Sequence, residues 1–304
     1  MRRKRLNLIA ALLLLAALVG GLGWLVYAPV RQERLNRALI AAIKQNETKK
    51  AIALLAEGAD ANARDTLPMN QSLWRLLLDR LRGKRPAPST APTALWVACC
   101  WSLEDNSPRD NATMVKALLD RGAALEAKDL ERRRTPLLCA LLWGNPAVSK
   151  LLIERGADVN ACDLAGYTPL ILAVFHNNKA LVKLLLDRGA DVNAIGEGVA
   201  WDGPALAAAQ WTHGDNPTIT KLLLSRGAKV NIPALPKGNL EWTPLYAAIH
   251  FDRSKSVRLL LQHGADVNFK PHGEGVTFLS PLSQALEKGD KQIIQMLKQA
   301  GAKE

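Results

Sequence analysis

Residues 166–193 decide the fold of this chain, and they read GYTPLILAVFHNNKALVKLLLDRGADVN. Thr168 can cap the start of a helix, and Pro169 loses no hydrogen bond at the first helical position. Apolar residues then recur at helical spacing, stop at Asn177, and resume until Gly189, where a positive φ can close a helix. The stretch predicts two short helices joined by a tight turn and followed by an extended hairpin, or finger.

This unit recurs along the chain with a nearly fixed period. The gaps between the glycines of successive Gly-Ala dipeptides are 64, 34, 33, 38, 37 and 37 residues. A period of this size is typical of repeat architectures, in which a helix pair buries its apolar face only against its neighbours. The dipeptides are Gly58-Ala59, Gly122-Ala123, Gly156-Ala157, Gly189-Ala190, Gly227-Ala228, Gly264-Ala265 and Gly301-Ala302.

The repeat closely resembles the ankyrin repeat in Thr168-Pro-Leu170, Leu184-Leu-Leu186 and Gly189-Ala-Asp-Val-Asn193. Thr135-Pro-Leu137 with Gly156-Ala-Asp-Val-Asn160, and Thr243-Pro-Leu245 with Gly264-Ala-Asp-Val-Asn268, repeat these residues. The four remaining copies depart from Thr-Pro-Leu and have in its place Arg37-Ala-Leu39, Thr93-Ala-Leu95, Pro204-Ala-Leu206 and Ser280-Pro-Leu282. Over residues 32–304 the resemblance implies an all-α fold, an ankyrin-repeat solenoid of about seven helix–turn–helix repeats with hairpin fingers.

The N-terminus carries a candidate membrane anchor. A basic tail, residues 1–5, precedes an uncharged stretch at 6–30, and the repeat domain follows at 31–304. As a helix the stretch would reach about 37 Å, enough to cross a bilayer. A cleaved signal peptide is the alternative, but its apolar core is usually only about 7–15 residues long. We therefore expect one N-terminal transmembrane helix, a signal-anchor, ahead of the solenoid.

The charges that flank this stretch predict its orientation. Four cations crowd the short tail, whereas Arg31, Arg34 and Arg37 on the other side are offset by Glu33. The denser cluster stays in the cytoplasm under the positive-inside rule. We therefore expect a single-pass membrane protein with a cytoplasmic N-terminus and an extracytoplasmic repeat domain, which in a bacterium is periplasmic.

An insert at 65–92 breaks the period between the first two repeats. Leu73, Trp74 and Leu77 lie at helical spacing among several arginines, and a Pro-rich link follows. A helix packed on the flank of the solenoid is the favoured interpretation, and a helix lying on the membrane surface is the alternative.

The formal net charge of the chain is +12, which is compatible with binding to nucleic acid. An extracytoplasmic repeat domain disfavours that partner.

The sequence contains no recognisable catalytic or metal-binding motif. Cys99, Cys100, Cys139 and Cys162 lack ligand spacing, and the five histidines are scattered over different repeats. We therefore expect no enzymatic activity, no cofactor and no metal. In an oxidising compartment one disulfide could form, and Cys100 with Cys139 is the pair to test.

Placing the repeats in register turns scattered aromatic residues into a stripe. Seven or eight residues after each Thr-Pro-Leu threonine, five consecutive repeats carry Trp101, Trp143, Phe175 with His176, Trp211, and His250 with Phe251. Tyr167 and Trp242, which directly precede Thr-Pro-Leu, and Trp201 in a finger would flank them. The ankyrin resemblance implies that this stripe faces the concave surface. Burial of the rings between repeats is the alternative, but the neighbouring core positions hold small residues.

These patterns predict a protein–protein interaction module displayed at a membrane, a monomeric solenoid that binds its partner through an aromatic concave groove. Exposed apolar stripes mark interaction sites, and Trp and Tyr are typical anchors of binding energy. Two narrower roles remain open: an immunity or inhibitor protein that neutralises an extracytoplasmic toxin or enzyme, and an assembly or tethering factor for an envelope enzyme.

Overall fold

The computed structural model describes residues 27–65, 91–100, 111–129, 131–195, 203–212, 214, 217–234, 242–269 and 279–303. The chain divides into two compact units: unit 1, Met1–Trp101 with Ser107–Ala124, and unit 2, Ser102–Asn106 with Leu125–Glu304. The helix predicted within 65–92 lies outside the described residues, and so does most of the Pro-rich link after it.

The predicted helix–turn–helix repeat is confirmed in unit 2. Helix α8, Pro169–Phe175, begins where the Thr168 hydroxyl accepts a hydrogen bond from the main-chain N–H of Ile171 at 3.3 Å. Asn177 makes the tight turn with a φ of 52°. The Asn178 side chain then caps helix α9, Lys179–Asp187, by accepting from the N–H of Leu181 at 3.1 Å.

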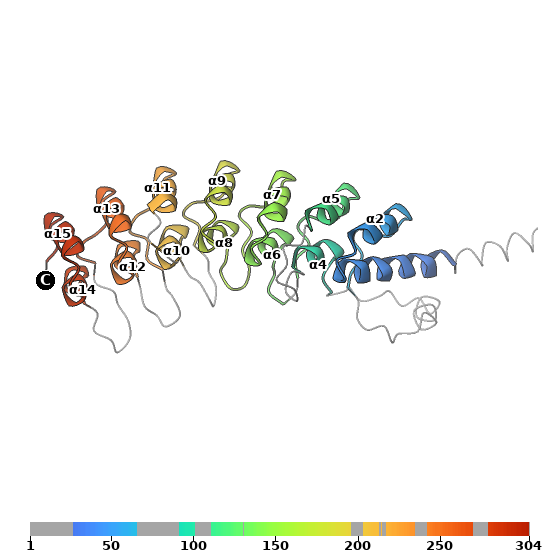
Figure 1. Cartoon of the computed structure of the whole chain (residues 1–304), viewed down its shortest axis with the longest axis horizontal. Helices are drawn as coiled ribbons and strands as arrows, with labels where there is room; N and C mark the ends of the chain where they lie inside the picture. The colour runs from blue at the N-terminus through green and yellow to red at the C-terminus, as the bar shows by residue number, and fades with distance from the viewer. Residues whose placement is uncertain are drawn as a thin grey trace, which may run out of the picture. The chain divides into compact units, whose positions relative to one another are not determined.

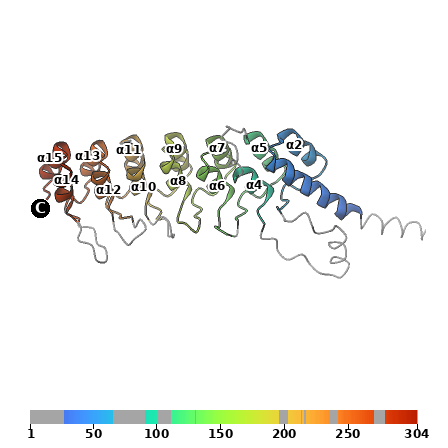
Figure 2. The same cartoon turned by 60° about the horizontal axis from the view of Figure 1, so that its bottom comes forward.

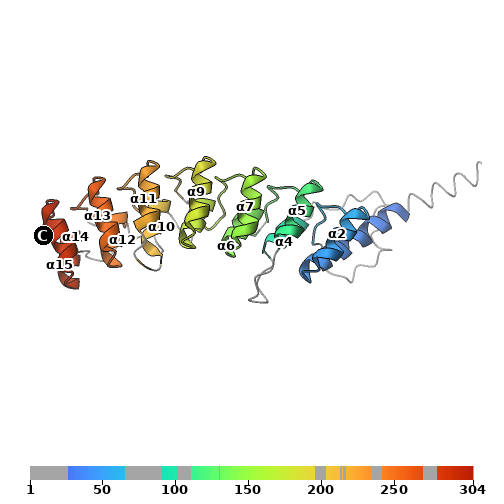
Figure 3. The ribbon, with the colours of Figure 1, turned by 45° about the horizontal axis from the view of Figure 1, so that its top comes forward.

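In unit 2, the first helices of successive repeats stack in one row and the second helices in another (Figure 1, Figure 2). The first row is α6 (Pro136–Leu142), α8, α10 (Ala205–Trp211), α12 (Pro244–His250) and α14 (Pro281–Lys288). The second row, seen from its own side in Figure 3, is α7 (Pro146–Glu154), α9, α11 (Pro217–Ser225), α13 (Ser254–Gln262) and α15 (Lys291–Gln299). Buried side chains such as Leu170 and Leu185 fill the space between the rows.

Unit 1 contains a helix at 27–44, α2 (Thr48–Ala56), α4 (Ala94–Cys100) and α5 (Ala112–Asp120). The expected repeat start at Arg37 falls inside the helix at 27–44, where Arg37 pairs with Glu33 at 2.8 Å. No Thr-Pro pair stands before Leu39, so no capping residue begins a new helix there. The first repeat therefore has a longer first helix than the sequence predicted.

The membrane anchor remains a prediction. Within the described ranges, which start at residue 27, no helix is both long and apolar enough to cross a bilayer. Residues 6–26 of the expected anchor lie outside those ranges. The expected boundary between residues 30 and 31 falls inside the helix at 27–44, and it stays a prediction.

A ladder of asparagine side chains, the Asn ladder, ties each repeat to the next. Asn160 Oδ1 accepts from the N–H of Asp191 at 2.8 Å, and its Nδ2 donates to the carbonyl of Gly189 at 3.2 Å. The other members with both bonds are Asn193, Asn231 and Asn268 in unit 2 and Asn62 in unit 1. In these five copies the Asn that ends the Gly-Ala motif thus sets the spacing between neighbouring repeats.

Glu126 replaces the ladder Asn in the Gly122-Ala-Ala-Leu-Glu126 copy. Its carboxylate accepts from the N–H of Asp158 at 2.9 Å, but it cannot donate to the carbonyl of Gly156. We expect Glu126→Asn to supply the missing donor and raise the free energy of unfolding by about 0.5–1 kcal/mol. Urea denaturation measures the change, with Glu126→Ala, expected to be destabilising, as the control. An unchanged stability of E126N would contradict this role.

The four cysteines differ in chemical state. Cys100 and Cys139, which the sequence selected for a disulfide test, are both disulfide-bonded. Cys99 and Cys162 carry free thiols. Burial raises the pKa of the Cys99 thiol, which keeps it protonated and unreactive.

Candidate functional site

The described aromatic residues of the predicted stripe lie where the first-row helices end. Trp143 follows α6, Phe175 ends α8 with His176 after it, Trp211 ends α10, and His250 ends α12 with Phe251 after it. Trp101 and Trp201 lie outside the described residues. The repeat register therefore placed six side chains at the same end of their helices.

The structure gathers five rings of α10 and α12 into one group, the aromatic cluster: Trp211, Trp242, Tyr246, His250 and Phe251. The Trp211 ring centroid lies 5.2 Å from that of Trp242 and 5.1 Å from that of Phe251. His250 lies 4.7 Å from Trp242 and 4.9 Å from Phe251. These separations are typical of favourable tilted and edge-to-face ring pairs.

Small residues explain why these rings sit at the edge of the stack and not in its core. Ala208 of α10 and Ala248 of α12 are fully buried, so the two helices approach closely. A large ring has no room at these two positions. Trp211, Trp242 and Phe251 are accordingly half-buried, which is less exposure than the sequence predicted and more than a core residue has.

Sequence reasoning missed Tyr246 as a member of this cluster. Its side chain is 4% exposed and its ring centroid lies 5.4 Å from that of Trp242, so it forms the base of the cluster. Tyr246 and His250 are four residues apart within α12, which places them on one face of that helix, whereas Trp242 precedes the helix and pairs with Ala234. That spacing was the available signal.

The cluster is electrically neutral at its centre. Burial lowers the pKa of His250, and Lys288 lowers it further while Asp252 opposes the shift. The imidazole is therefore uncharged at neutral pH, with its Nδ1 accepting a hydrogen bond from Gln284 Nε2 at 3.2 Å. An uncharged ring preserves the apolar character of the surface.

Arg253 forms a cationic rim beside the cluster. Its guanidinium carbon lies 6.0 Å from the Phe251 ring centroid, and its Nη2 donates to the carbonyl of Thr212 at 2.8 Å. The side chain thus links the start of α13 to the end of α10. An apolar patch with a polar rim has the composition of a protein-binding surface.

The second described group of stripe residues belongs to α6 and α8. Tyr167 and Phe175 form an edge-to-face pair with centroids 6.0 Å apart. Trp143 is 38% exposed, and His176, also exposed, has its Nε2 3.1 Å from the carbonyl oxygen of Leu142. These residues form a second aromatic group, on earlier repeats of unit 2.

An ion pair holds the finger that carries Tyr167. Asp163 Oδ2 accepts from Arg134 Nε at 3.0 Å, and the two side chains are only 2% and 12% exposed. Asp163 Oδ1 also accepts from the N–H groups of Ala165 and Tyr167, both at 2.9 Å. One carboxylate therefore fixes the turn that ends at the aromatic surface.

Across the described part of the chain, no three His, Cys, Asp or Glu side chains come together in a way that could hold a metal ion.

Comparisons with known proteins agree with this architecture. The family model described as ankyrin repeats (3 copies) matches residues 66–163, 103–195 and 205–304. An ankyrin repeat protein of Acanthamoeba polyphaga mimivirus is 28% identical over 140 residues, which is 43% of this chain and 17% of that protein. The chain therefore spans only a small part of the length of this relative.

Three solved ankyrin repeat domains superpose on the chain. A domain from Acinetobacter baumannii AYE has a TM-score of 0.55 at 27% identity, covering 69% of this chain and 98% of its own. The domain of Bcl-3, a member of the IkappaB protein family, has a TM-score of 0.57 at 23% identity, covering 86% and 97%. Human ASB11 has a TM-score of 0.59 at 20% identity, covering 88% and 98%. The last two likenesses concern the fold alone.

Proposed function

Because the chain belongs to the ankyrin repeat family, whose repeats generally serve as non-enzymatic protein-interaction modules, we propose that it binds a protein partner through the aromatic cluster. The single observation that carries this proposal is the packing of Trp211, Trp242 and Phe251 as half-buried rings around one another. Aromatic side chains that are rigid and only partly covered supply much of the binding energy at protein interfaces.

The cluster is also pre-organised. Tyr246 supports the rings from below, and Arg253 is held by its bond to Thr212 at 2.8 Å. Few side-chain rotamers would then be lost on binding, which lowers the entropic cost of association. Trp143, Tyr167 and Phe175 would extend the contact over the earlier repeats.

The proposal includes display at a membrane, with the repeats outside the cytoplasm. The basic tail before the apolar stretch at 6–30 supports the anchor and its orientation. The disulfide-bonded state of Cys100 and Cys139 supports an oxidising compartment, because disulfides seldom persist in the cytosol. Proximity labelling from the C-terminus in living cells would report the compartment and the partner together.

The partner found in this way allows a direct test of the aromatic cluster. We expect full-length Trp211→Ala/Trp242→Ala to weaken its affinity at least about tenfold, because two ring anchors are lost. Trp211→Phe/Trp242→Phe retains both rings and should keep most of the affinity. Titration calorimetry of the purified proteins measures both variants.

A second control separates binding from folding. Ile52, 37% exposed on α2 of unit 1, provides an apolar truncation outside unit 2 in I52A. Circular dichroism should show the same helix content for all variants. Equal affinity of the double alanine variant and the wild type would refute the proposal.

A further inference from the structure

A second surface of unit 2 carries a periodic row of cations. Six residues before Gly156, Gly189, Gly227 and Gly264 stand Lys150, Lys183, Lys221 and Arg258, one on each of α7, α9, α11 and α13, whereas Gln295 takes this position in α15. All four side chains are exposed. We call this row the basic stripe, and it lies on the second-row helices, whereas the aromatic cluster belongs to α10 and α12 of the first row.

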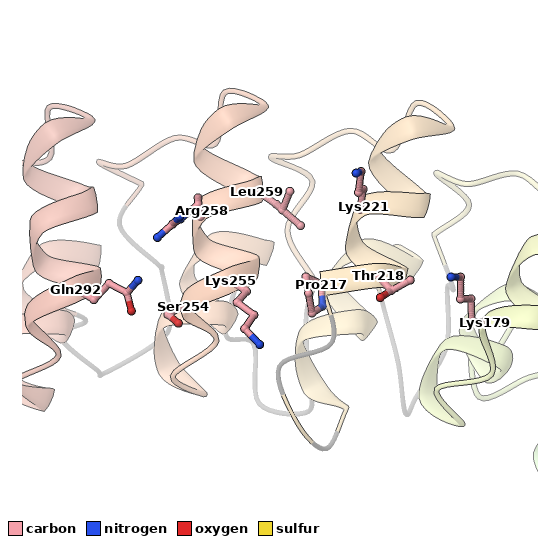
Figure 4. A pocket seen from close by; sticks show the side chains of 9 residues that line it. All are labelled: Lys179, Pro217, Thr218, Lys221, Ser254, Lys255, Arg258, Leu259 and Gln292. Atoms are coloured by element: carbon pink, nitrogen blue, oxygen red, sulfur yellow. The ribbon is translucent and has the colours of Figure 1, made fainter.

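The basic stripe borders a hollow of about 780 Å³ that spans α9, α11, α13 and α15 (Figure 4). Lys221 and Arg258 line it together with Lys179 and Lys255, and the hydroxyls of Thr218 and Ser254 add hydrogen-bonding groups. All the charged residues that line the hollow are cationic. Figure 4 shows Lys255 reaching from α13 toward α11, and Arg258 reaching toward α15.

Helix stability does not explain this placement of charge. Lys179 and Lys255 lie in the first turns of α9 and α13, next to the positive ends of the helix dipoles. The first turns of α9, α11 and α13 contain no acidic residue. Within the described part of the chain, no carboxylate lies within ion-pair distance of Lys179, Lys221 or Arg258. Lys150, in contrast, pairs with Glu154 at 3.8 Å. The positive potential around Lys179, Lys221 and Arg258 is therefore available to an external anion.

We propose that the basic stripe and its hollow bind an extended acidic segment of a partner protein. Helices that pack side by side lie about 8–10 Å apart. An extended chain rises about 3.3 Å per residue, so one carboxylate about every third residue would meet one cation per repeat. The hydroxyl of Ser254 can donate a hydrogen bond to such a carboxylate.

The shape and composition favour a peptide over the two other anionic partners. A bilayer surface is broad, whereas the cations border a hollow that follows successive helices. Single-stranded nucleic acid relies on aromatic stacking, and no aromatic side chain lines this hollow. This surface is independent of the aromatic cluster, so its test does not depend on the proposed function.

Fluorescence anisotropy with the full-length protein in a non-ionic detergent tests the proposal. The probe is a labelled peptide of about 12 residues with glutamate at every third position. In about 50 mM salt we expect Lys221→Gln/Arg258→Gln to weaken binding about fivefold or more, and we expect added salt to weaken wild-type binding. The matched control is Lys229→Gln/Lys303→Gln, which removes the same charge at two exposed positions outside the hollow. W211A/W242A should bind the peptide as the wild type does.

Three results would overturn the inference. The first is equal loss of affinity in the stripe variant and its matched control, and the second is no binding of the peptide by the wild type. The third is displacement of the peptide by phosphatidylserine-doped micelles or by a single-stranded oligonucleotide at lower concentration than unlabelled peptide, which would assign the surface to lipid or nucleic acid. Unchanged melting temperatures of both variants establish that the fold is retained.

Discussion

Replacement of Asp163 by Asn is expected to lower the free energy of unfolding by about 3 kcal/mol. The Asn oxygen can still accept from the N–H groups of Ala165 and Tyr167. Its NH₂ group, however, would face the Nε–H of Arg134, so two donors would meet where an ion pair stood at 3.0 Å. The guanidinium is only 12% exposed, so water compensates little for the lost carboxylate.

A double-mutant cycle with Arg134→Met isolates this ion pair. Urea denaturation of D163N, R134M and the double variant gives the coupling energy. We expect the double variant to be more stable than D163N alone, because it leaves no uncompensated buried charge. Additive losses in the two single variants would show that the ion pair contributes nothing to the finger.

Asn193→Ala is expected to lower the free energy of unfolding by about 2 kcal/mol, because it removes two bonds of the Asn ladder. The lost contacts join Asn193 to the N–H of Lys229 at 2.8 Å and to the carbonyl of Gly227 at 3.0 Å. Stability in a solenoid depends on such interfaces between neighbouring repeats. The loss of stability should therefore affect more than one repeat.

A graded series separates the two bonds. Asn193→Asp keeps the acceptor and loses the donor, as Glu126 does in its own copy, so we expect about half the loss seen with N193A. Urea denaturation followed by circular dichroism measures the series. Equal stability of N193A and the wild type would show that the Asn ladder does not hold the repeats together.

The sequence predicted the fold well because its decisive signals are local. Thr168 and Gly189 act on the backbone within their own repeat, and they take the expected capping and positive-φ roles. The start of the first repeat was wrong because no such signal stands at Arg37. Hydrogen bonds between repeats were harder to predict. The Gly-Ala-Asp-Val-Asn motif was recognised, but the two hydrogen bonds of its Asn side chain join the next repeat, and no pattern within a single repeat indicates them.

The candidate site was predicted in position but not in arrangement. Repeat register placed Trp211 and Phe251 at matching helix ends, and the structure brings their rings within 5.1 Å. Their partial burial depends on the packing of Trp242 against both repeats, which register alone does not give. The same repeat register could have revealed the basic stripe. Lys221 and Arg258 are far apart in the sequence, but each stands six residues before the glycine of its Gly-Ala dipeptide.

The contacts of the Asn ladder join successive repeats whatever the length of the finger between them. Glycine-to-glycine spacing ranges from 33 to 38 residues between Gly156 and Gly301, yet the ladder contacts recur at each junction that keeps the Asn. Insertions and deletions in a finger are therefore tolerated without a change in the pitch of the stack. Natural selection, or an engineer grafting a recognition loop, can diversify what this surface contacts while the scaffold stays constant.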